Sequence, residues 1–285
     1  MTADHASVPM PRRRAGRGHA VERGLIYLGA TLLALFILVP IYLIAVSAFT
    51  PRAQAFDFPR SIVPSELSVE TILFFLNASG VMDSFWRSVA VALITLGLSL
   101  AIGAPAGYAL ARYVFRGREG YRLVILSTRA FPIVILAIPL AVTYRVWGID
   151  DTVLGVALMH TALALPFTVL ITSSVFVSVP RELEEAAQTL GCNPLQAFMR
   201  VSLPLALPGL AAAAIFTWVL SWNDVFAAVI LTLREPTLPA KILSALTQSP
   251  IYFQFAAGFV MLVPSLVVIF FIRRYLLGLW GRVVK

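Results

Sequence analysis

Side chains that could carry out catalysis are few in this sequence and lie far apart along it. The histidines are His5, His19 and His160, and Cys192 is the single cysteine. A catalytic centre needs several such groups clustered at one place, and one cysteine forms neither an intrachain disulfide nor a cysteine-ligated metal site. The pattern therefore predicts no metal, no cofactor held by this chain and no enzyme active site.

The lysines argue against nucleotide hydrolysis by the chain itself. A P-loop requires G-x4-G-K-[ST], in which the lysine reaches the phosphates. The sequence has only Lys241 and Lys285, and neither follows a glycine-rich loop or precedes Ser or Thr. If the protein works with ATP, the nucleotide and its Mg²⁺ must be bound by another subunit.

The composition instead predicts a protein whose main solvent is lipid. Hydrophobic residues make up 59% of the chain and charged residues 13%, against roughly 45–50% and about 25% in average soluble domains. So little charge cannot solvate a globular surface. The net charge of +8 does not indicate nucleic-acid binding, because the chain has no zinc-like spacing, no basic region with interleaved aromatics and no groove-reading motif.

Six apolar stretches are long enough, at about 20 residues, to cross a bilayer as helices. They cover residues 24–49, 88–111, 123–147, 152–179, 205–233 and 256–279. Residues 24–281 are therefore predicted to form an all-α membrane domain of six transmembrane helices. The first stretch is too long for the apolar core of a signal peptide and lacks an A-x-A site, so we expect it to be retained behind a disordered basic tail at 1–23.

Arginine and lysine are distributed unequally between the two sides of this arrangement. The tail, the loops after the second and fourth spans and the C-terminus carry 15 of them, and the opposite side carries five. Basic residues concentrate on the cytoplasmic side of membrane proteins. The asymmetry predicts that both termini and the loop at 180–204 lie in the cytoplasm, where basic residues also face the lipid bilayer surface.

The loop at 180–204 is polar and helix-forming, although apolar spans flank it. "ELEEAAQTL" combines strong helix formers with acidic groups near the helix start, and Gly191 permits a left-handed stop. Asn193 is a suitable N-cap for a second helix, which we expect Pro204 and Pro208 to end. A rigid pair of helices could dock into a groove of a partner, although charged helices could equally serve only to solvate the loop.

The same loop carries a long motif of fixed spacing. Glu185-Ala186-Ala187, then Gly191 after three residues, then Val201-Ser202-Leu203-Pro204 after nine more match E-A-A-x3-G-x9-I-x-L-P, with Val in place of Ile. In this the chain resembles the membrane-spanning permease subunits of bacterial ABC importers.

The resemblance extends from about Arg23 to Lys285. "SWNDVFAAVILT" at 221–232, with Asp224 in place of Glu, "TLPAKI" from Thr237 and "LLGLWGRVVK" from Leu276 are similar to carbohydrate-type permeases. Within that group the chain resembles the smaller six-span subunit of the maltose-type permease pair.

This resemblance implies a type I ABC importer fold in the bacterial plasma (inner) membrane. It implies a second permease subunit, two copies of a cytoplasmic ATPase subunit that bind ATP and Mg²⁺, and an extracytoplasmic solute-binding protein that delivers a sugar or polyol. It also implies that the loop at 180–204 forms a coupling helix seated in a cleft of the ATPase. Closure of the ATPase would then rock the attached spans, since packed interfaces switch between discrete states.

Three sets of candidate residues follow. The expected ATPase-coupling residues are Glu184, Glu185, Ala186, Ala187, Gly191, Pro194, Leu203 and Pro204. The expected translocation-path residues are Trp222, Asn223, Asp224, Pro132 and Pro139. The expected contacts with the binding protein are Thr237, Leu238, Pro239 and Ser249.

Two polar residues inside the predicted spans, Asp224 and His160, need separate consideration. A carboxylate inside a span marks function by default, so Asp224 is open to a structural or a substrate-contacting role. His160 is expected to be a hydrogen-bonded packing residue, because buried polar groups rarely lack partners.

Other transport functions compete with a sugar importer. An ABC permease for another solute, such as a glycerol phosphodiester, would carry the same loop motif. A secondary carrier working alone fits less well, because the sequence has no evident inverted repeat and one intramembrane acid.

Overall fold

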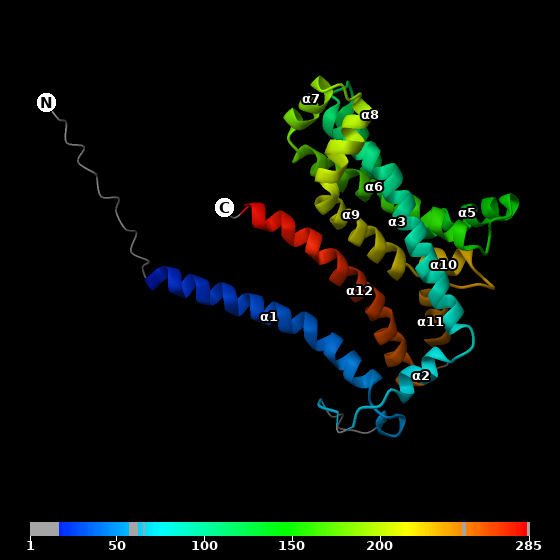
Figure 1. Ribbon diagram of the computed structural model, residues 1–285. Coiled ribbons are helices and arrows are strands. Elements are labelled where there is room, and N and C mark those ends of the chain that lie inside the picture. Colours follow the sequence, from blue (N-terminus) through cyan, green and yellow to red (C-terminus); the bar gives the residue numbers. More distant parts are fainter. Residues whose placement is uncertain (1–16, 57–61, 65, 247–248, 284–285) are drawn as a thin grey trace.

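The computed structural model describes residues 17–56, 62–64, 66–246 and 249–283, and within them every regular element is a helix (Figure 1). The α-helices are α1 (Arg17–Ala48), α2 (Glu70–Leu76), α3 (Val81–Arg112), α4 (Arg118–Ser127), α5 (Ile133–Trp147), α6 (Val153–Val177), α7 (Arg181–Thr189), α8 (Pro194–Ala197), α9 (Leu203–Asn223), α10 (Phe226–Leu231), α11 (Leu238–Leu246) and α12 (Ile251–Val283). This confirms the all-α fold class.

Five helical segments of the described chain are long and apolar enough to cross a membrane, and a bent pair makes a sixth. They are Val21–Ala48, Val81–Arg112, Val153–Val177, Pro194–Asn223 and Ile251–Arg273. The sixth is the region expected at 123–147, where α4 and α5 are bent by 88°. Phe131 is extended at the bend because the ring of Pro132 disfavours a helical residue before it.

Several helix ends differ from the expected span limits. α1 begins at Arg17, inside the tail expected to be disordered, because its Arg, Ala and Glu residues favour helix beyond the lipid core; residues 1–16 lie outside the described residues. α3 begins at Val81 rather than at 88. The span expected at 205–233 is two helices, and Asp224 lies at the break between them with φ −71° and ψ 127°.

The centre of the bundle is formed by α3, α6 and α9, which lie side by side (Figure 1). Small residues let α3 approach α6 closely: a Cβ on Gly107 would lie 2.1 Å from Thr172 Oγ1. Thr172 in turn donates a hydrogen bond to the carbonyl of Gly103 at 2.9 Å. Such contacts replace the hydrophobic effect as the force between helices in lipid, so α3 and α6 form one tightly packed unit.

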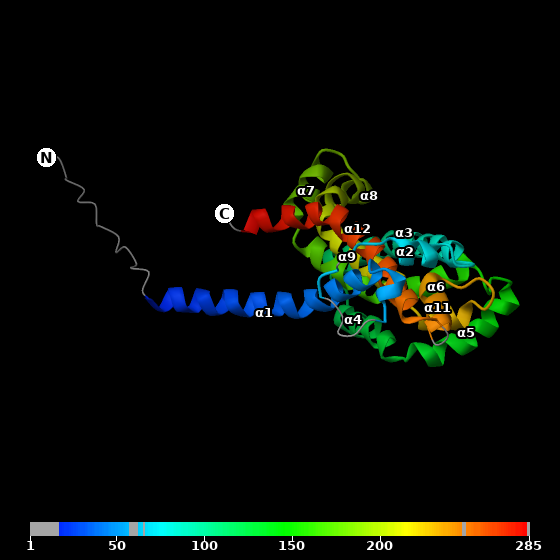
Figure 2. The ribbon, with the colours of Figure 1, turned by 90° about the horizontal axis from the view of Figure 1, so that it is seen from below.

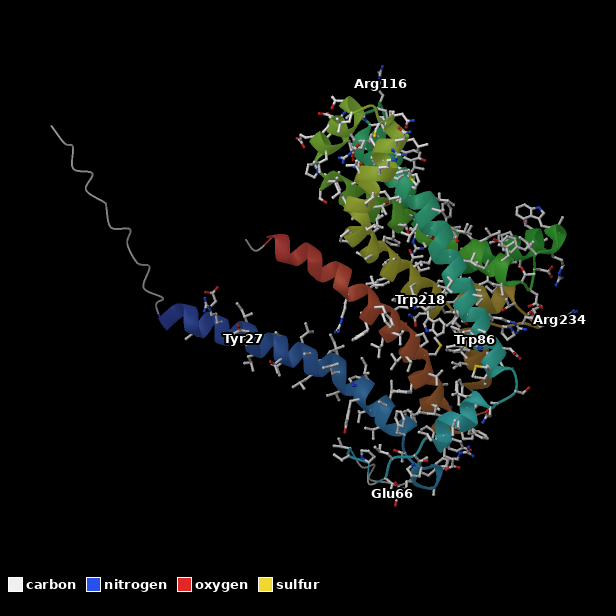
Figure 3. All side chains as sticks on the ribbon, in the orientation of Figure 1. Tyr27, Glu66, Trp86, Arg116, Trp218 and Arg234 are labelled. Carbon is white, nitrogen blue, oxygen red and sulfur yellow. The ribbon has the colours of Figure 1, made fainter. Side chains whose placement is uncertain are left out.

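The first helix leaves this bundle. α1 packs against α12 near its C-terminal end, and its first half projects away from the other helices in both views (Figures 1 and 2). Its apolar side chains, including Tyr27 and Phe36, are exposed (Figure 3). A helix this apolar needs lipid or another subunit around it.

Candidate functional site

The loop motif forms a compact corner at one end of the bundle, where α6 ends and α9 begins (Figure 1). Gly191 has φ +93°, which favours glycine, and ends α7. Asn193 Oδ1 accepts from the Gln196 N–H at 2.8 Å, and Gln196 Oε1 accepts from the Asn193 N–H at 3.0 Å. This reciprocal capping box fixes the start of α8.

The second helix of the corner does not end at Pro204 or Pro208, which corrects the expectation from the prolines. A π-helical turn, Phe198–Ser202, joins α8 to α9, and the Leu203 N–H bonds the carbonyl of Phe198. The wider turn shifts the hydrogen-bond register just where Pro204 has no N–H to offer. The helix therefore runs from Pro194 to Asn223 and enters the membrane as one rod.

Most of the motif faces outward. Glu185, Ala186, Gly191, Pro194 and Pro204 are exposed, whereas Ala187 is buried and Leu203 is half-buried. Glu185 Oε1 lies 3.2 Å from Arg181 Nε on the same helix. This exposed set is what a partner groove would meet.

Two leucines on the corner were missed by the sequence reasoning. Leu190 is 87% exposed and Leu195 is 70% exposed. Large exposed apolar side chains on a polar loop are candidates for contact with a partner. The signal was present in the sequence as leucines just before Gly191 and just after Pro194.

Unlike the exposed members of the expected coupling set, Glu184 points into the bundle. Its side chain is buried and accepts hydrogen bonds from Tyr108 Oη at 2.8 Å and Arg112 Nε at 2.7 Å. Burial alone would raise the pKa of Glu184, but the nearby Ser202 hydroxyl and the hydrogen bonds from Arg112 and Tyr108 outweigh it and hold the pKa below its usual range. Glu184 is therefore ionised and engaged within the chain.

Asp224 and His160 form a buried polar network between α6 and α9. Asp224 Oδ2 accepts from the N–H groups of Ala227 at 3.0 Å and Ala228 at 3.3 Å, and so caps α10. His160 Nε2 lies 3.2 Å from the same oxygen, and its Nδ1 lies 2.9 Å from Ser221 Oγ. The geometry gives Asp224 a structural role, and the expected hydrogen-bonded state of His160 is present.

Trp222, one of the expected path residues, is buried in the core of this chain. Its indole stacks on Trp218 at 5.7 Å between centroids and donates to the carbonyl of Met261 on α12 at 2.9 Å. Its neighbour Asn223 is exposed. Trp222 therefore ties α9 to α12.

An open pocket of about 760 Å³ lies beside the bent α4–α5 pair and is bounded by α3 and α6. Pro139, one of the expected path residues, lines it together with Tyr121, Arg129 and Thr143; Pro132 is exposed at the bend outside this lining. Arg129 Nη1 donates to the carbonyl of Leu163 at 2.8 Å. The guanidinium thus turns inward to α6 instead of extending to the membrane surface.

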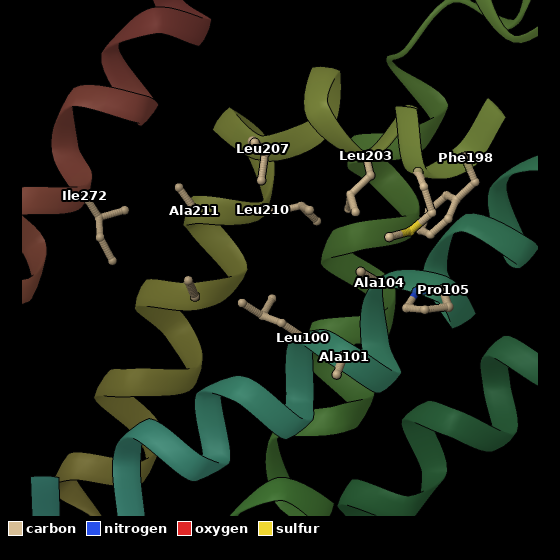
Figure 4. A pocket seen from close by; sticks show the side chains of 12 residues that line it. Leu100, Ala101, Ala104, Pro105, Phe198, Leu203, Leu207, Leu210, Ala211 and Ile272 are labelled. Carbon is tan, nitrogen blue, oxygen red and sulfur yellow. The ribbon is translucent and has the colours of Figure 1, made fainter. Parts of the chain in front are cut away.

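A second cavity, of about 550 Å³, lies between α3, α9 and α12 (Figure 4). Its lining is apolar and includes Leu100, Pro105, Phe198, Leu207 and Ile272. It offers no hydrogen-bonding side chain to a hydroxylated solute.

The residues expected to meet a binding protein are mostly covered. Thr237, Leu238 and Pro239 are buried, and the Leu238 N–H bonds Ser88 Oγ at 2.7 Å, so they pack α11 onto α3. Ser249 is half-buried. The first three are therefore packing residues within this chain.

The exposed residues near this segment are those of the turn 233–235, just before it in the chain. Asp151 accepts from the N–H groups of all three of its residues at 3.0–3.2 Å. Arg234 of this turn projects from the same edge of the bundle as α5 (Figure 3). The turn is thus a rigid, exposed feature that the sequence motif did not single out.

The chain is thus a bundle of membrane-length helices that carries a helical corner at one end. The chain belongs to the family described as the binding-protein-dependent transport system inner membrane component, whose model matches residues 100–277. It is therefore a membrane subunit of an ABC importer, not an enzyme, and the ATPase of such a system is a separate subunit.

Relatives and solved structures agree with this. The trehalose transport system permease protein SugB of Mycobacterium tuberculosis is 31% identical, over 90% of this chain and 95% of that protein. The diacetylchitobiose uptake system permease protein NgcG of Streptomyces coelicolor is 30% identical, over 96% of this chain and 89% of that protein. A chain of a bacterial ABC transporter involved in the import of the acidic polysaccharide alginate shares the fold, with TM-score 0.71 and 21% identity over 93% of this chain and 100% of that chain.

Proposed function

We propose that this chain forms half of the translocation pathway of an ATP-driven importer for a sugar or related polyol. The observation that carries the proposal is the similarity, along nine-tenths of the chain, to a permease named for trehalose transport. The similarity to sugar permeases does not favour the alternative solute, a glycerol phosphodiester, and the family to which the chain belongs disfavours a stand-alone carrier.

The proposed assembly follows from the surfaces that the chain leaves open. A second permease subunit pairs with this one, and the exposed apolar α1 suits a place against it or in lipid. Two copies of an ATPase subunit, which bind ATP and Mg²⁺, dock at the corner formed by α7 and α8. An extracytoplasmic binding protein meets the opposite end, where the turn 233–235 is exposed. Both termini then lie in the cytoplasm of a bacterium.

The proposed mechanism is mechanical. Glu185, Ala186, Gly191 and Pro194 present the corner to the ATPase, and the exposed leucines beside them seat it. Because the helix from Pro194 to Asn223 is continuous, a displacement of the corner moves the whole rod through the membrane. The small residues between α3 and α6 keep these helices moving as one unit.

The test is substrate-dependent uptake by the complete importer. The chain is reconstituted in vesicles with the permease, ATPase and binding protein encoded beside it, and labelled trehalose, diacetylchitobiose, a polyol and a glycerol phosphodiester are supplied with ATP inside the vesicles. We expect uptake of a sugar or polyol and no uptake of the phosphodiester. Uptake of the phosphodiester alone would contradict the proposed solute class.

A further inference from the structure

We propose that Arg112 and Glu184 are positioning residues that transmit movement of the coupling corner to α3. The inference rests on the proposed function, in which the ATPase moves that corner. The corner is joined through the chain to α6 and α9, but α3 ends at Arg112 and continues into a different loop. Packing against α6 couples α3, which is central to the bundle, to the corner indirectly, and a direct contact between α3 and α7 adds a second, polar link.

The guanidinium of Arg112 donates hydrogen bonds to the corner at two places. Arg112 Nε donates to Glu184 Oε1 at 2.7 Å, in the first half of α7. Arg112 Nη2 donates to the carbonyl of Val179 at 2.9 Å, just before α7 begins. A planar guanidinium holds such acceptors in fixed relative positions, which the single ammonium of a lysine cannot do. The contact therefore sets both the position and the direction of α7 relative to α3.

The second carboxylate oxygen is held from the same helix. Tyr108, about one turn before Arg112, donates from its hydroxyl to Glu184 Oε2 at 2.8 Å. The Tyr108 ring packs against Phe176 of α6 at 5.4 Å and Phe198, at the base of α9, at 4.6 Å between centroids. The Glu184 carboxylate and the Tyr108 ring thus connect α3 and α7 with the ends of α6 and α9.

This contact is protected from water. The side chains of Arg112 and Glu184 are 9% and 5% exposed. Removing one member of a buried, hydrogen-bonded ion pair leaves the other charge uncompensated and is strongly unfavourable. The remainder of α7 is mostly exposed, with Ala187 as its other buried residue. Glu184 is therefore the polar anchor through which α7 is attached to the bundle.

The Arg112–Glu184 pair could transmit movement from α7 to α3 or only stabilise the fold, and these two roles predict different results. If the pair only stabilises the fold, a variant forms less complex, but each assembled complex still moves the same amount of solute per ATP. If the pair transmits movement, assembled complexes hydrolyse ATP while moving less solute. The deciding quantity is the ratio of solute taken up to ATP hydrolysed, measured on equal amounts of assembled importer.

The experiment compares Glu184→Gln and Arg112→Gln with matched controls in the reconstituted importer. The control Glu119→Gln replaces an exposed carboxylate at the start of α4, and the control Arg116→Gln replaces an exposed guanidinium in the loop after α3 (Figure 3). We expect the uptake-to-hydrolysis ratio of the first two variants to fall by about fivefold or more, the lower end of typical coupling between sites. We expect the controls to match the unsubstituted importer, and all four to retain the ATPase during purification.

A chemical rescue keeps the test decisive if the single variants assemble poorly. Arg112→Cys and Glu184→Cys are combined with Cys192→Ser, and a short bifunctional thiol reagent bridges the two positions. We expect the bridged importer to regain its uptake-to-hydrolysis ratio and the unbridged one to lack it. An unchanged ratio in the single variants, or arrest of transport by the bridge, would overturn the link. Failure of the proposed function itself would appear differently, as no ATP-dependent uptake by the unsubstituted importer.

Discussion

Gly191 provides the sharpest test of whether the corner must keep its shape. Its φ of +93° is a conformation that residues other than glycine adopt at a cost of roughly 1–2 kcal/mol. A Cβ placed there meets nothing within 4 Å, so Gly191→Ala introduces strain without a clash. The variant keeps its N–H, which bonds the Gln188 carbonyl at 3.0 Å. The strain alone therefore disfavours the turn by a factor of about 5–30.

Gly117 offers a matched control for this variant. Its φ is +90°, and a Cβ there also meets nothing within 4 Å, but it lies between α3 and α4. Gly117→Ala should lower the free energy of unfolding by a similar amount and leave the corner intact. The two variants thus differ in where the strain falls and not in its size.

The assay is binding of the ATPase subunit to vesicles that contain the permease pair. We expect Gly191→Ala to weaken this binding by up to the same factor of about 5–30, because only the fraction with the correct turn binds. Gly191→Pro, which locks φ near −65° and removes the N–H, should abolish uptake while the protein still inserts. Equal binding by Gly191→Ala and Gly117→Ala would refute the reasoning, whether both bind normally or both bind weakly.

Three further predictions follow from the same structure. Leu190→Ala and Leu195→Ala should each weaken ATPase binding about tenfold or more, since burying a leucine contributes about 1.5–3 kcal/mol; unchanged titration curves would count against a seat for these side chains. Gly107→Ala should lower the thermal midpoint of the purified protein through overpacking of about 1–3 kcal/mol, whereas Gly97→Ala, where a Cβ meets nothing within 4 Å, should not. Because the pKa of Glu184 is lowered in the fold, its stabilising contribution is complete above its unfolded pKa of about 4.3 and is lost only as pH falls through the lowered value. The uptake-to-hydrolysis ratio should therefore stay constant from about pH 6 to 8, and a fall within that window would indicate another titrating group.

The spans and the corner could be predicted because their signals are local. Apolar length identifies the spanning helices, and the Gly191 stop and the Asn193 cap act within a few residues. The motif spacing indicated the family, and the match of the family model to residues 100–277 confirms it. Pro132 lies at the break in the third span, whereas Pro139 lies inside α5.

Side-chain direction could not be predicted, because it depends on distant partners. Glu184 and Glu185 are adjacent in sequence, yet only Glu184 finds Arg112 and Tyr108, 72 and 76 residues away. The burial of Trp222 depends on α12, which provides the carbonyl of Met261 as a hydrogen-bond acceptor for the indole. The continuous helix through Pro204 depends on a π-turn that proline content alone does not reveal.

The most direct measurement of the central claim is solute uptake by the permease pair with its binding protein, with and without the ATPase subunit. We predict uptake only when the ATPase and ATP are both present on the side of the α7–α8 corner, and none when an ion gradient is applied in their absence. Solute accumulation driven by an ion gradient without the ATPase would contradict the account.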